Sequence, residues 1–180
     1  MSKNVLIIST SCRKNGNSET LARRFAGGAA ESGHAVEFLR AADYDIRFCR
    51  GCMTCGKTKR CPVQDDAAGL IAKISAADAV VFATPIYYYE MSGLMKTLLD
   101  RCNPLYETDY RFRDIYFLST AADNEPWVPE RAREGLGGWI LCFPKSRLAG
   151  SVFAGGVNAV GEIAGHPALE QAYQMGLNIK

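Results

Sequence analysis

The chain has 180 residues, of which 48% are apolar and 22% charged, a composition typical of a globular protein with one core. Its 21 Lys and Arg against 19 Asp and Glu leave a net charge of +2, which argues against a protein that holds nucleic acid through its overall field. No stretch approaches the roughly 20 apolar residues that cross a bilayer, and the apolar run near the start is too short for a signal peptide. We therefore expect a cytoplasmic protein with no membrane partner and no nucleic-acid partner.

Short apolar runs alternate with helical patterns along the whole chain. The runs predict strands over residues 5–8, 35–39, 79–83, 115–118 and 151–154. Apolar residues at helical spacing predict helices over 18–33, from Asp65 or Asp66 past Ile74, over about 92–101, from Pro129 to Phe143 and from Pro167 to Leu177. We expect residues 1–180 to form one domain with a cysteine-rich insertion at about 45–65.

Five strand-helix repeats with strands that are apolar on both faces predict an α/β fold. The expected architecture is a doubly wound three-layer sandwich around a five-stranded parallel sheet, because right-handed crossovers place helices on both faces. Such sheets bind ligands at the carboxyl ends of their strands, where the strand order reverses. The loops after the first, third and fourth strands are therefore the expected sites.

The loop after the first strand, 9–18, is rich in hydroxyls and amides and carries two cations, Arg13 and Lys14. A helix N-terminus with short polar side chains favours a phosphate group, and an arginine can bind two phosphate oxygens at once. The alternative is a polar turn that caps the helix through Asn17 or Ser18. The spacing excludes a Walker loop and lacks the G-x-G-x-x-G fingerprint of dinucleotide-binding proteins. No Arg follows Cys12 six residues later, so Cys12 is expected to pack rather than act as a phosphatase nucleophile.

The loop after the third strand places three successive tyrosines, 87–89, just past a buried strand. A flat conjugated ring could lie against this backbone and these aromatic faces. The alternative is a strand end that packs on a helix, with one of the three tyrosines at most touching a ligand.

Four of the seven cysteines fall between residues 49 and 61 in the pattern C-x-x-C-x-x-C-x₅-C. Thiolates from Cys49, Cys52, Cys55 and Cys61 could hold a [4Fe–4S] cluster. The alternatives are redox or structural thiols, or a zinc site, which usually combines two separate knuckles. Five cations and no acid accompany these thiols, which would favour thiolates, neutralise an anionic cluster or attract a dinucleotide's phosphates.

Taken together, loop 9–18, the segment from Thr84 to Arg101, the cysteine block to Asp66 and the helix around residues 168–173 resemble one known group. The chain is similar to the NADPH-dependent FMN reductases and iron–sulfur flavoproteins of the flavodoxin-like superfamily. The resemblance implies a flavodoxin-like fold, FMN as cofactor and a homodimer or higher homo-oligomer.

The same resemblance implies the roles of individual residues. The FMN phosphate would be surrounded by Ser9, Ser11, Arg13, Asn15, Asn17 and Ser18. The isoalloxazine ring would be lined by Pro85, Ile86, Tyr87 and Tyr88. The loop after the fourth strand, residues 120–123, would close its other edge, with Ala121 and Asp123 as binding residues.

The expected activity is hydride transfer from NADH or NADPH to flavin N5, with electrons passed on to a quinone, free flavin or another small-molecule or protein acceptor. The flavin supplies this chemistry, so no catalytic side chain is predicted. The alternative is an electron-transfer flavoprotein that docks to redox partners and turns over no nicotinamide. A non-enzymatic flavin sensor is a third class.

Several residues are expected to play no part in the site. Cys102 and Cys142 are predicted to be small buried hydrophobes on helices. Lys96 and Arg101 lie on one predicted helix, for which the default expectation is a solvated face.

Overall fold

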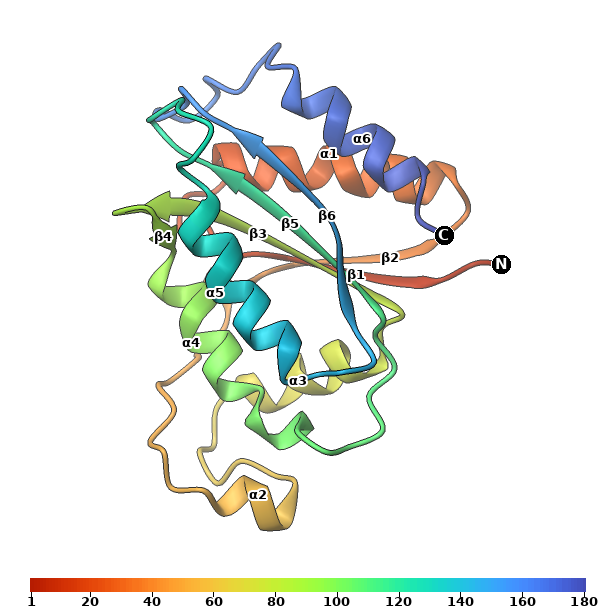
Figure 1. Cartoon of the computed structure of the whole chain (residues 1–180), viewed down its shortest axis with the longest axis vertical. Helices are drawn as coiled ribbons and strands as arrows, with labels where there is room; N and C mark the ends of the chain where they lie inside the picture. The colour runs from red at the N-terminus through yellow and green to blue at the C-terminus, as the bar shows by residue number, and fades with distance from the viewer.

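The computed structural model describes residues 1–180 and contains one six-stranded sheet (Figure 1). Its strands are β1 (Asn4–Ser9), β2 (Ala35–Arg40), β3 (Ala79–Tyr87), β4 (Glu90–Met91), β5 (Asp114–Thr120) and β6 (Arg147–Ala154). The order is β2-β1-β3-β5-β6 with every pair parallel, and the short β4 pairs antiparallel to β3. Apart from β4, this is the 2-1-3-4-5 order of the flavodoxin-like fold, so the predicted fold class is confirmed.

Helices cover both faces of the sheet. One face carries α1 (Asn17–Glu31) and α6 (Ala168–Leu177), and the other carries α3 (Ala67–Ala76), α4 (Gly93–Arg101) and α5 (Glu130–Leu141) (Figure 1). The five-residue helix α2 (Thr54–Thr58) lies outside these layers, and two 3₁₀ turns, η1 (Ala41–Asp43) and η2 (Asn103–Leu105), follow β2 and α4. The buried side chains form two apolar clusters, one on each side of the sheet.

The strands differ in burial according to their place in the sheet. Every residue of β5 and all but the first of β1 are buried, whereas β2 has one buried residue and β6 has two, and their other residues are exposed or half-buried. The expectation that strands are apolar on both faces therefore holds for the centre of the sheet and not for its edges, where one flank meets solvent.

The helices α1 and α6 approach each other closely through two glycines. A Cβ built at Gly28 would lie 2.0 Å from the Tyr173 carbonyl oxygen, and one at Gly176 would lie 2.2 Å from that of Phe25. Any side chain at either position would collide with the backbone of the other helix. The position of α1, and of the loop that leads into it, is fixed in this way.

Several element boundaries differ from the predictions. Strand β3 ends at Tyr87, four residues later than expected, because its last part pairs with β5 and then with the hairpin strand β4. Strand β6 begins four residues earlier than expected, at Arg147. Helices α5 and α6 begin just after Pro129 and Pro167, which precede the first helical residue instead of occupying it.

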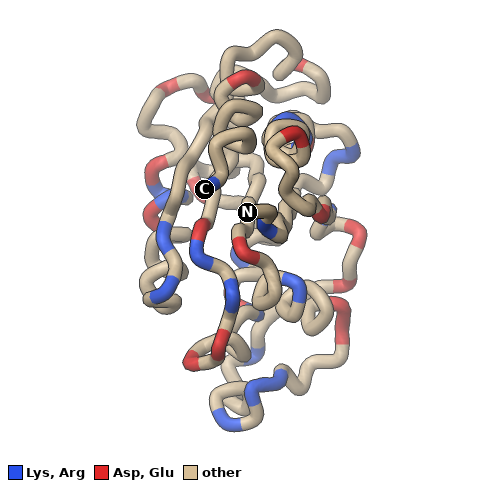
Figure 2. The backbone as a smooth tube through the Cα atoms, turned by 90° about the vertical axis from the view of Figure 1, so that its right-hand side faces the viewer, with Lys and Arg blue, Asp and Glu red and all other residues tan.

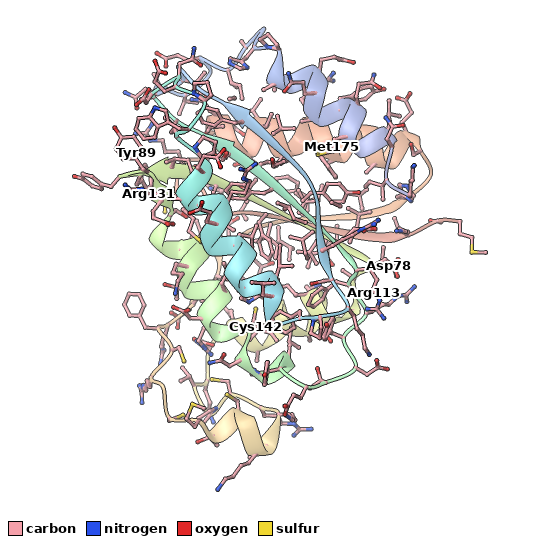
Figure 3. All side chains as sticks on the ribbon, viewed as in Figure 1. Asp78, Tyr89, Arg113, Arg131, Cys142 and Met175 are labelled. Carbon is pink, nitrogen blue, oxygen red and sulfur yellow. The ribbon has the colours of Figure 1, made fainter.

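Two predicted core cysteines have different environments. Cys102, at the end of α4, is fully buried as predicted, but Cys142, just after α5, is exposed, so that prediction is wrong (Figure 3). The last turn of α5 packs through Ile140 and Phe143 and leaves Cys142 on the outer side. No helix of the structure is both long and apolar enough to cross a membrane.

Candidate functional site

A cavity of about 140 Å³ lies where the strands β1, β3, β5 and β6 end. It is lined by thirteen residues from the ends of β3 and β5, the start of α1 and the loops after the strands, namely Ser11, Arg13, Gly16, Asn17, Ser18, Pro85, Ile86, Tyr87, Thr120, Ala122, Val157, Asn158 and Val160. Arg13 is the one charged residue among them and none is acidic. The cavity therefore presents a positive field at the edge of the sheet where ligands of such folds bind.

The loop between β1 and α1 forms the polar wall of this cavity. Gly16 precedes the first helical residue, and no side chain caps the helix. The backbone N–H groups of Asn17, Ser18 and Glu19 have no hydrogen-bond partner within the chain. Unpaired N–H groups at the start of a fifteen-residue helix attract an anion, which favours the phosphate interpretation over the capping turn.

Close packing holds this loop in shape. A Cβ at Gly16 would lie 2.9 Å from the Ser11 hydroxyl and 3.1 Å from the Arg13 carbonyl oxygen, so the turn has no room for a side chain. The Ser18 hydroxyl lies 2.7 Å from that of Thr120 and joins the start of α1 to the end of β5. Serine hydroxyls at the ends of β1 and β5, those of Ser9 and Ser119, are buried and have no partner.

The carboxylate of Glu19 fixes the loop from the helix side. It accepts hydrogen bonds from the Asn15 backbone N–H at 3.1 Å, from Arg23 at 2.6 Å and from Arg40 at 3.0 Å. Burial alone would raise the pKa of Glu19, but these hydrogen bonds and the two guanidinium charges outweigh burial and lower it below 4.5. Glu19 is thus ionised and bound to two arginines, and none of the three residues lines the cavity.

The loop between β6 and α6 completes the cavity, and the sequence analysis did not assign it. Arg13 Nη1 donates to the Asn158 carbonyl oxygen at 2.7 Å, and Asn17 Nδ2 donates to that of Ala159 at 2.9 Å. The Ile163 backbone N–H donates to Asn17 Oδ1 at 3.4 Å. The topological rule for strand ends could have indicated this loop, since β6 is the neighbour of β5.

The apolar wall comes from the end of β3 and the hairpin that follows it. Tyr87 pairs with Glu90, and the two residues between them, Tyr88 and Tyr89, have φ values of 51° and 64°. Two successive residues with positive φ form a type I′ hairpin turn, which glycine and asparagine usually occupy. Bulky residues there are strained, so the fold holds two tyrosines in an unfavourable conformation beside the cavity.

The three tyrosines have different environments. Tyr87 lines the cavity, whereas Tyr88 is 98% exposed and is not among the lining residues. Tyr89 lies in the hairpin turn (Figure 3), and its ring centroid is 4.8 Å from that of Trp127. Of the three, Tyr87 alone contributes to the cavity.

Buried hydroxyls join the two walls. Ser92, which precedes α4, accepts a hydrogen bond from Met95 N–H, and its hydroxyl lies 3.2 Å from that of Thr84 and 3.1 Å from that of Thr10. The Thr10 hydroxyl in turn donates to the Ala83 carbonyl oxygen at 3.0 Å. This chain of bonds fixes the tyrosine loop relative to loop 9–18, a role the sequence did not indicate.

The predicted binding residues divide into two groups. Seven line the cavity, namely Ser11, Arg13, Asn17, Ser18, Pro85, Ile86 and Tyr87, and five do not, namely Ser9, Asn15, Tyr88, Ala121 and Asp123. Asn15 is exposed and Asp123 binds the Glu125 N–H. After β5, the cavity is lined by Thr120 and Ala122 instead of their neighbours, because successive residues point in opposite directions.

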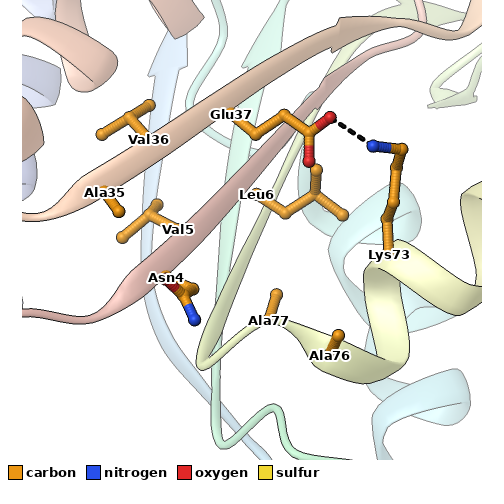
Figure 4. Close-up of a pocket in the computed structure, with 9 residues that line it drawn as sticks. All are labelled: Asn4, Val5, Leu6, Ala35, Val36, Glu37, Lys73, Ala76 and Ala77. Carbon is orange, nitrogen blue, oxygen red and sulfur yellow. Dashed lines mark hydrogen bonds and ion pairs between the residues drawn. The ribbon is translucent and has the colours of Figure 1, made fainter.

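A second hollow, of about 290 Å³, lies near the opposite ends of the strands. It is bounded by the first residues of β1 and β2 and the end of α3, and the ion pair between Glu37 and Lys73 crosses it at 2.5 Å (Figure 4). Since it lies at the amino ends of the strands, it is not where this fold places its ligands.

The four clustered cysteines do not come together in this structure. No group of three or more His, Cys, Asp or Glu side chains is arranged to hold a metal ion. Cys49 and Cys52 are exposed, Cys55 and Cys61 are half-buried, and Cys49 lies beside Asn103, where the amide reaches its sulfur at 3.9 Å. The predicted ligand set for a cluster or zinc therefore does not fit the structure, because the thiols lie in a segment that the core does not shape.

The ends of this cysteine segment, residues 47–65, are held together by a buried ion pair. Arg101 donates to both oxygens of Asp65, at 2.5 Å and 2.9 Å, and to the Arg47 carbonyl oxygen at 2.7 Å. Both side chains of the pair are fully buried. The hydrogen bonds from Arg101 lower the pKa of Asp65 below 3.8 although burial opposes them. The expectation of a solvated Arg101 is wrong, because its partner lies outside its own helix; Lys96 is exposed as expected.

Comparisons with known proteins agree with this fold. The sequence model of the family described as NADPH-dependent FMN reductase matches residues 3–127. An iron–sulfur flavoprotein of Methanocaldococcus jannaschii is 36% identical over 101 residues, which are 56% of this chain and 52% of that protein. One of Methanosarcina thermophila is 22% identical over 93% of this chain and 85% of that protein. The chain spans about half the length of the M. jannaschii relative.

Solved structures share the architecture of the whole chain. The NAD(P)H:quinone oxidoreductase of Methanothermobacter marburgensis superposes with a TM-score of 0.76 over 99% of this chain and 97% of that one, at 18% identity. At this identity the similarity is one of fold.

Proposed function

The chain belongs to the NADPH-dependent FMN reductase family, and on that premise we propose that it is an FMN-dependent oxidoreductase that uses a reduced nicotinamide dinucleotide. The single observation that carries this proposal is the cavity of about 140 Å³ at the strand ends, with unpaired helix N–H groups and Arg13 on one wall and Pro85 to Tyr87 on another. An anionic tail and an apolar ring require these two kinds of surface.

The residues of the cavity fit FMN. The unpaired N–H groups of Asn17, Ser18 and Glu19 are donors that need an acceptor, and the glycine at position 16 leaves the turn open where a Cβ would collide. We propose that these groups, Arg13 and the hydroxyls of Ser11 and Ser18 hold the phosphate. Arg13 lines the cavity and uses one nitrogen for the Asn158 carbonyl oxygen, which leaves its other N–H groups available to a phosphate.

The side chains of this protein would position the cofactor and exclude water. We propose that Pro85, Ile86 and Tyr87 line the ring and that Thr120, Ala122 and the loop after β6 close the opposite side. When bound, FMN supplies hydride acceptance from NADH or NADPH and electron transfer to a quinone, free flavin or another acceptor. Because the cysteines do not form a ligand group, the proposed activity includes no metal cluster.

The test of the binding site is the affinity for FMN. Arg13→Ala is expected to weaken FMN binding about 10- to 100-fold, because a charged hydrogen-bond donor to phosphate is worth roughly 1.5–3 kcal/mol. Lys14→Ala removes the same charge from the adjacent exposed position, outside the cavity, and is expected to have little effect. Fluorescence titration of FMN measures both, and an unchanged affinity in Arg13→Ala would contradict the proposal.

A second candidate is an electron-transfer flavoprotein that docks to redox partners. The exposed cysteine segment favours it, because Arg50, Lys57 and Arg60 have no ion-pair partner there and Phe48 and Met53 are strongly exposed. Anaerobic rapid mixing of the FMN-loaded protein with NADPH separates the two. Prompt bleaching of the flavin supports the reductase, and no bleaching supports the carrier.

We further propose that a second copy of the chain covers the mouth of the cavity. Tyr88 is 98% exposed and Trp127 is 51% exposed, and both lie on or against the hairpin that carries Tyr87. Exposed aromatic side chains of this kind mark interaction surfaces. Sedimentation equilibrium is expected to give a dimer that Tyr88→Ser weakens, and a monomer in the unaltered protein would contradict this.

A further inference from the structure

A cavity of about 540 Å³ lies outside the proposed flavin site and shares no residue with it. It is enclosed by the end of the cysteine segment, one face of α3 and the chain around η2. Its volume falls within the roughly 300–1,000 Å³ of small-molecule sites. The proposed oxidoreductase function uses none of these residues.

One wall of this cavity is apolar. Ala68, Ile71 and Ala72 recur at the spacing of one helix face on α3, and Pro104 and Leu105 of η2 also line it. Such a wall can pack against the apolar body of an organic molecule. It offers no polar group to replace the water that a free inorganic ion would lose.

The other wall is cationic. Lys59 and Arg60 follow α2, and none of the ten lining residues is acidic. Lys59 Nζ donates to the Tyr106 carbonyl oxygen at 3.1 Å and lies 3.9 Å from the exposed carboxylate of Glu107. Arg60 has no ion-pair partner. In Figure 2 this lower end of the molecule carries blue positions and no red ones on the α2 segment.

Local hydrogen bonds define where the two cations stand. Lys59 has a left-handed φ of 55° and ends α2 through its N–H bond to the Cys55 carbonyl oxygen at 2.9 Å. The Thr58 hydroxyl donates to the Arg60 carbonyl oxygen at 2.9 Å and accepts from the Arg60 N–H at 3.2 Å. These bonds fix the backbone of both residues, which line the cavity together with the apolar face of α3.

We propose that this cavity is a second ligand site, for a small organic anion with a flat apolar body such as an aromatic carboxylate or sulfonate. The apolar face of α3 would take the body, and Lys59 and Arg60 would take the charge. The inference is independent of the flavin proposal, since a protein that does not bind FMN would still carry this cavity.

The probe for the test is 8-anilinonaphthalene-1-sulfonate, titrated into the folded FMN-saturated protein and followed by its fluorescence. One saturable site is expected. Ala72→Phe, which fills the cavity from α3, is expected to abolish it. Ala76→Phe places the same bulk on the same helix outside this cavity and is expected to leave binding intact. Far-UV circular dichroism checks that both variants are folded.

Charge variants test the second half of the proposal. The double variant Lys59→Gln and Arg60→Gln is expected to weaken probe binding about tenfold, since each partly exposed charge contributes a few-fold in affinity. The matched pair Arg50→Gln and Lys57→Gln removes the same charge from the same segment away from the cavity. Unchanged binding in Ala72→Phe, or equal weakening by the two charge pairs, would overturn the proposal.

Discussion

Loop 9–18 and the cysteine segment, residues 47–65, both carry reactive or ligand-binding residue types in a connection after a parallel strand, yet the fold treats them differently. The first is buried at Ser9, Thr10 and Ser11 and is bonded to the ends of β3, β5 and β6. The second is largely exposed and forms one helix of five residues. A loop that packs against the core has a defined conformation. The conformation of a long exposed insertion is restricted mainly by the contacts at its two ends.

The cysteine segment has little core packing and is held by hydrogen bonds and an ion pair at its two ends. Asp65 accepts hydrogen bonds from Arg101, from the Arg47 N–H at 2.9 Å and from the Ala67 N–H at 3.1 Å, and Asp66 bonds to Asp45 in both directions. Loop 9–18 is therefore held by many core contacts, whereas one buried ion pair and a few hydrogen bonds hold the ends of the cysteine segment.

The largest effect is expected from breaking that ion pair. Arg101→Met keeps the bulk of the side chain and leaves Asp65 buried without its charge partner, which should lower the free energy of unfolding by about 3–5 kcal/mol. Lys96→Met, on the same helix, breaks the exposed pair with Asp100 and should cost less than about 1 kcal/mol. Urea denaturation measures both, and equal losses would show that the pair does not hold the segment.

In α1, the helix that loop 9–18 leads into, the most sensitive position is expected to be Gly28. Gly28→Ala should lower the free energy of unfolding by about 3 kcal/mol, because the new methyl group meets the Tyr173 carbonyl oxygen of α6. Gly27→Ala, where the nearest atom is 4.0 Å away, should instead stabilise α1 by up to about 1 kcal/mol. Thermal unfolding compares the two, and similar shifts would mean that α6 can move aside.

Acid should weaken the closure of the second region. Because Arg101 lowers the folded-state pKa of Asp65, the pair contributes stability above the unfolded value of 3.8, and this is lost as the pH falls through the folded pKa. Stability measured from pH 5 to pH 2 should fall less steeply in Arg101→Met than in the unaltered protein. Parallel curves would mean that Asp65 titrates without regard to its partner.

The smallest effect concerns thiol chemistry. Burial raises the pKa of Cys102 to about 12, so about one part in ten thousand is thiolate at pH 8. By contrast, hydrogen bonds with Thr54 lower the pKa of the exposed Cys52 below 9.0. Brief alkylation with iodoacetamide, read by peptide mass spectrometry, should label Cys52 early and leave Cys102 unlabelled. Early labelling of Cys102 would show that the end of α4 opens.

Local patterns predicted most of the fold. The apolar runs identified the five main strands because central strands of a parallel sheet are buried on both faces, and the composition of loop 9–18 indicated an anion site because short polar side chains surround a helix start. The hairpin strand β4 was not predicted, because Tyr88 and Tyr89 stand where glycine or asparagine usually indicates a type I′ turn.

Local patterns could not predict contacts between residues that are far apart in the sequence. Arg101 lies on α4 at a position that its own helix would leave solvated, and its partner is 36 residues earlier in the chain. Arg13 and Asn17 bond to a loop more than 140 residues later. Lys59 and Ala72 line one cavity because the end of the cysteine segment lies beside α3.

The amino-acid sequence by itself determined the order of strands and helices, the polar composition of the loop before the first helix and the exceptional composition of the cysteine segment, because periodicity, capping and side-chain chemistry act over a few residues. The tertiary structure alone decided which residues face the cavity, which charge is buried and whether the four thiols converge. These depend on the directions in which side chains point after the layers have packed, and no local pattern specifies those directions.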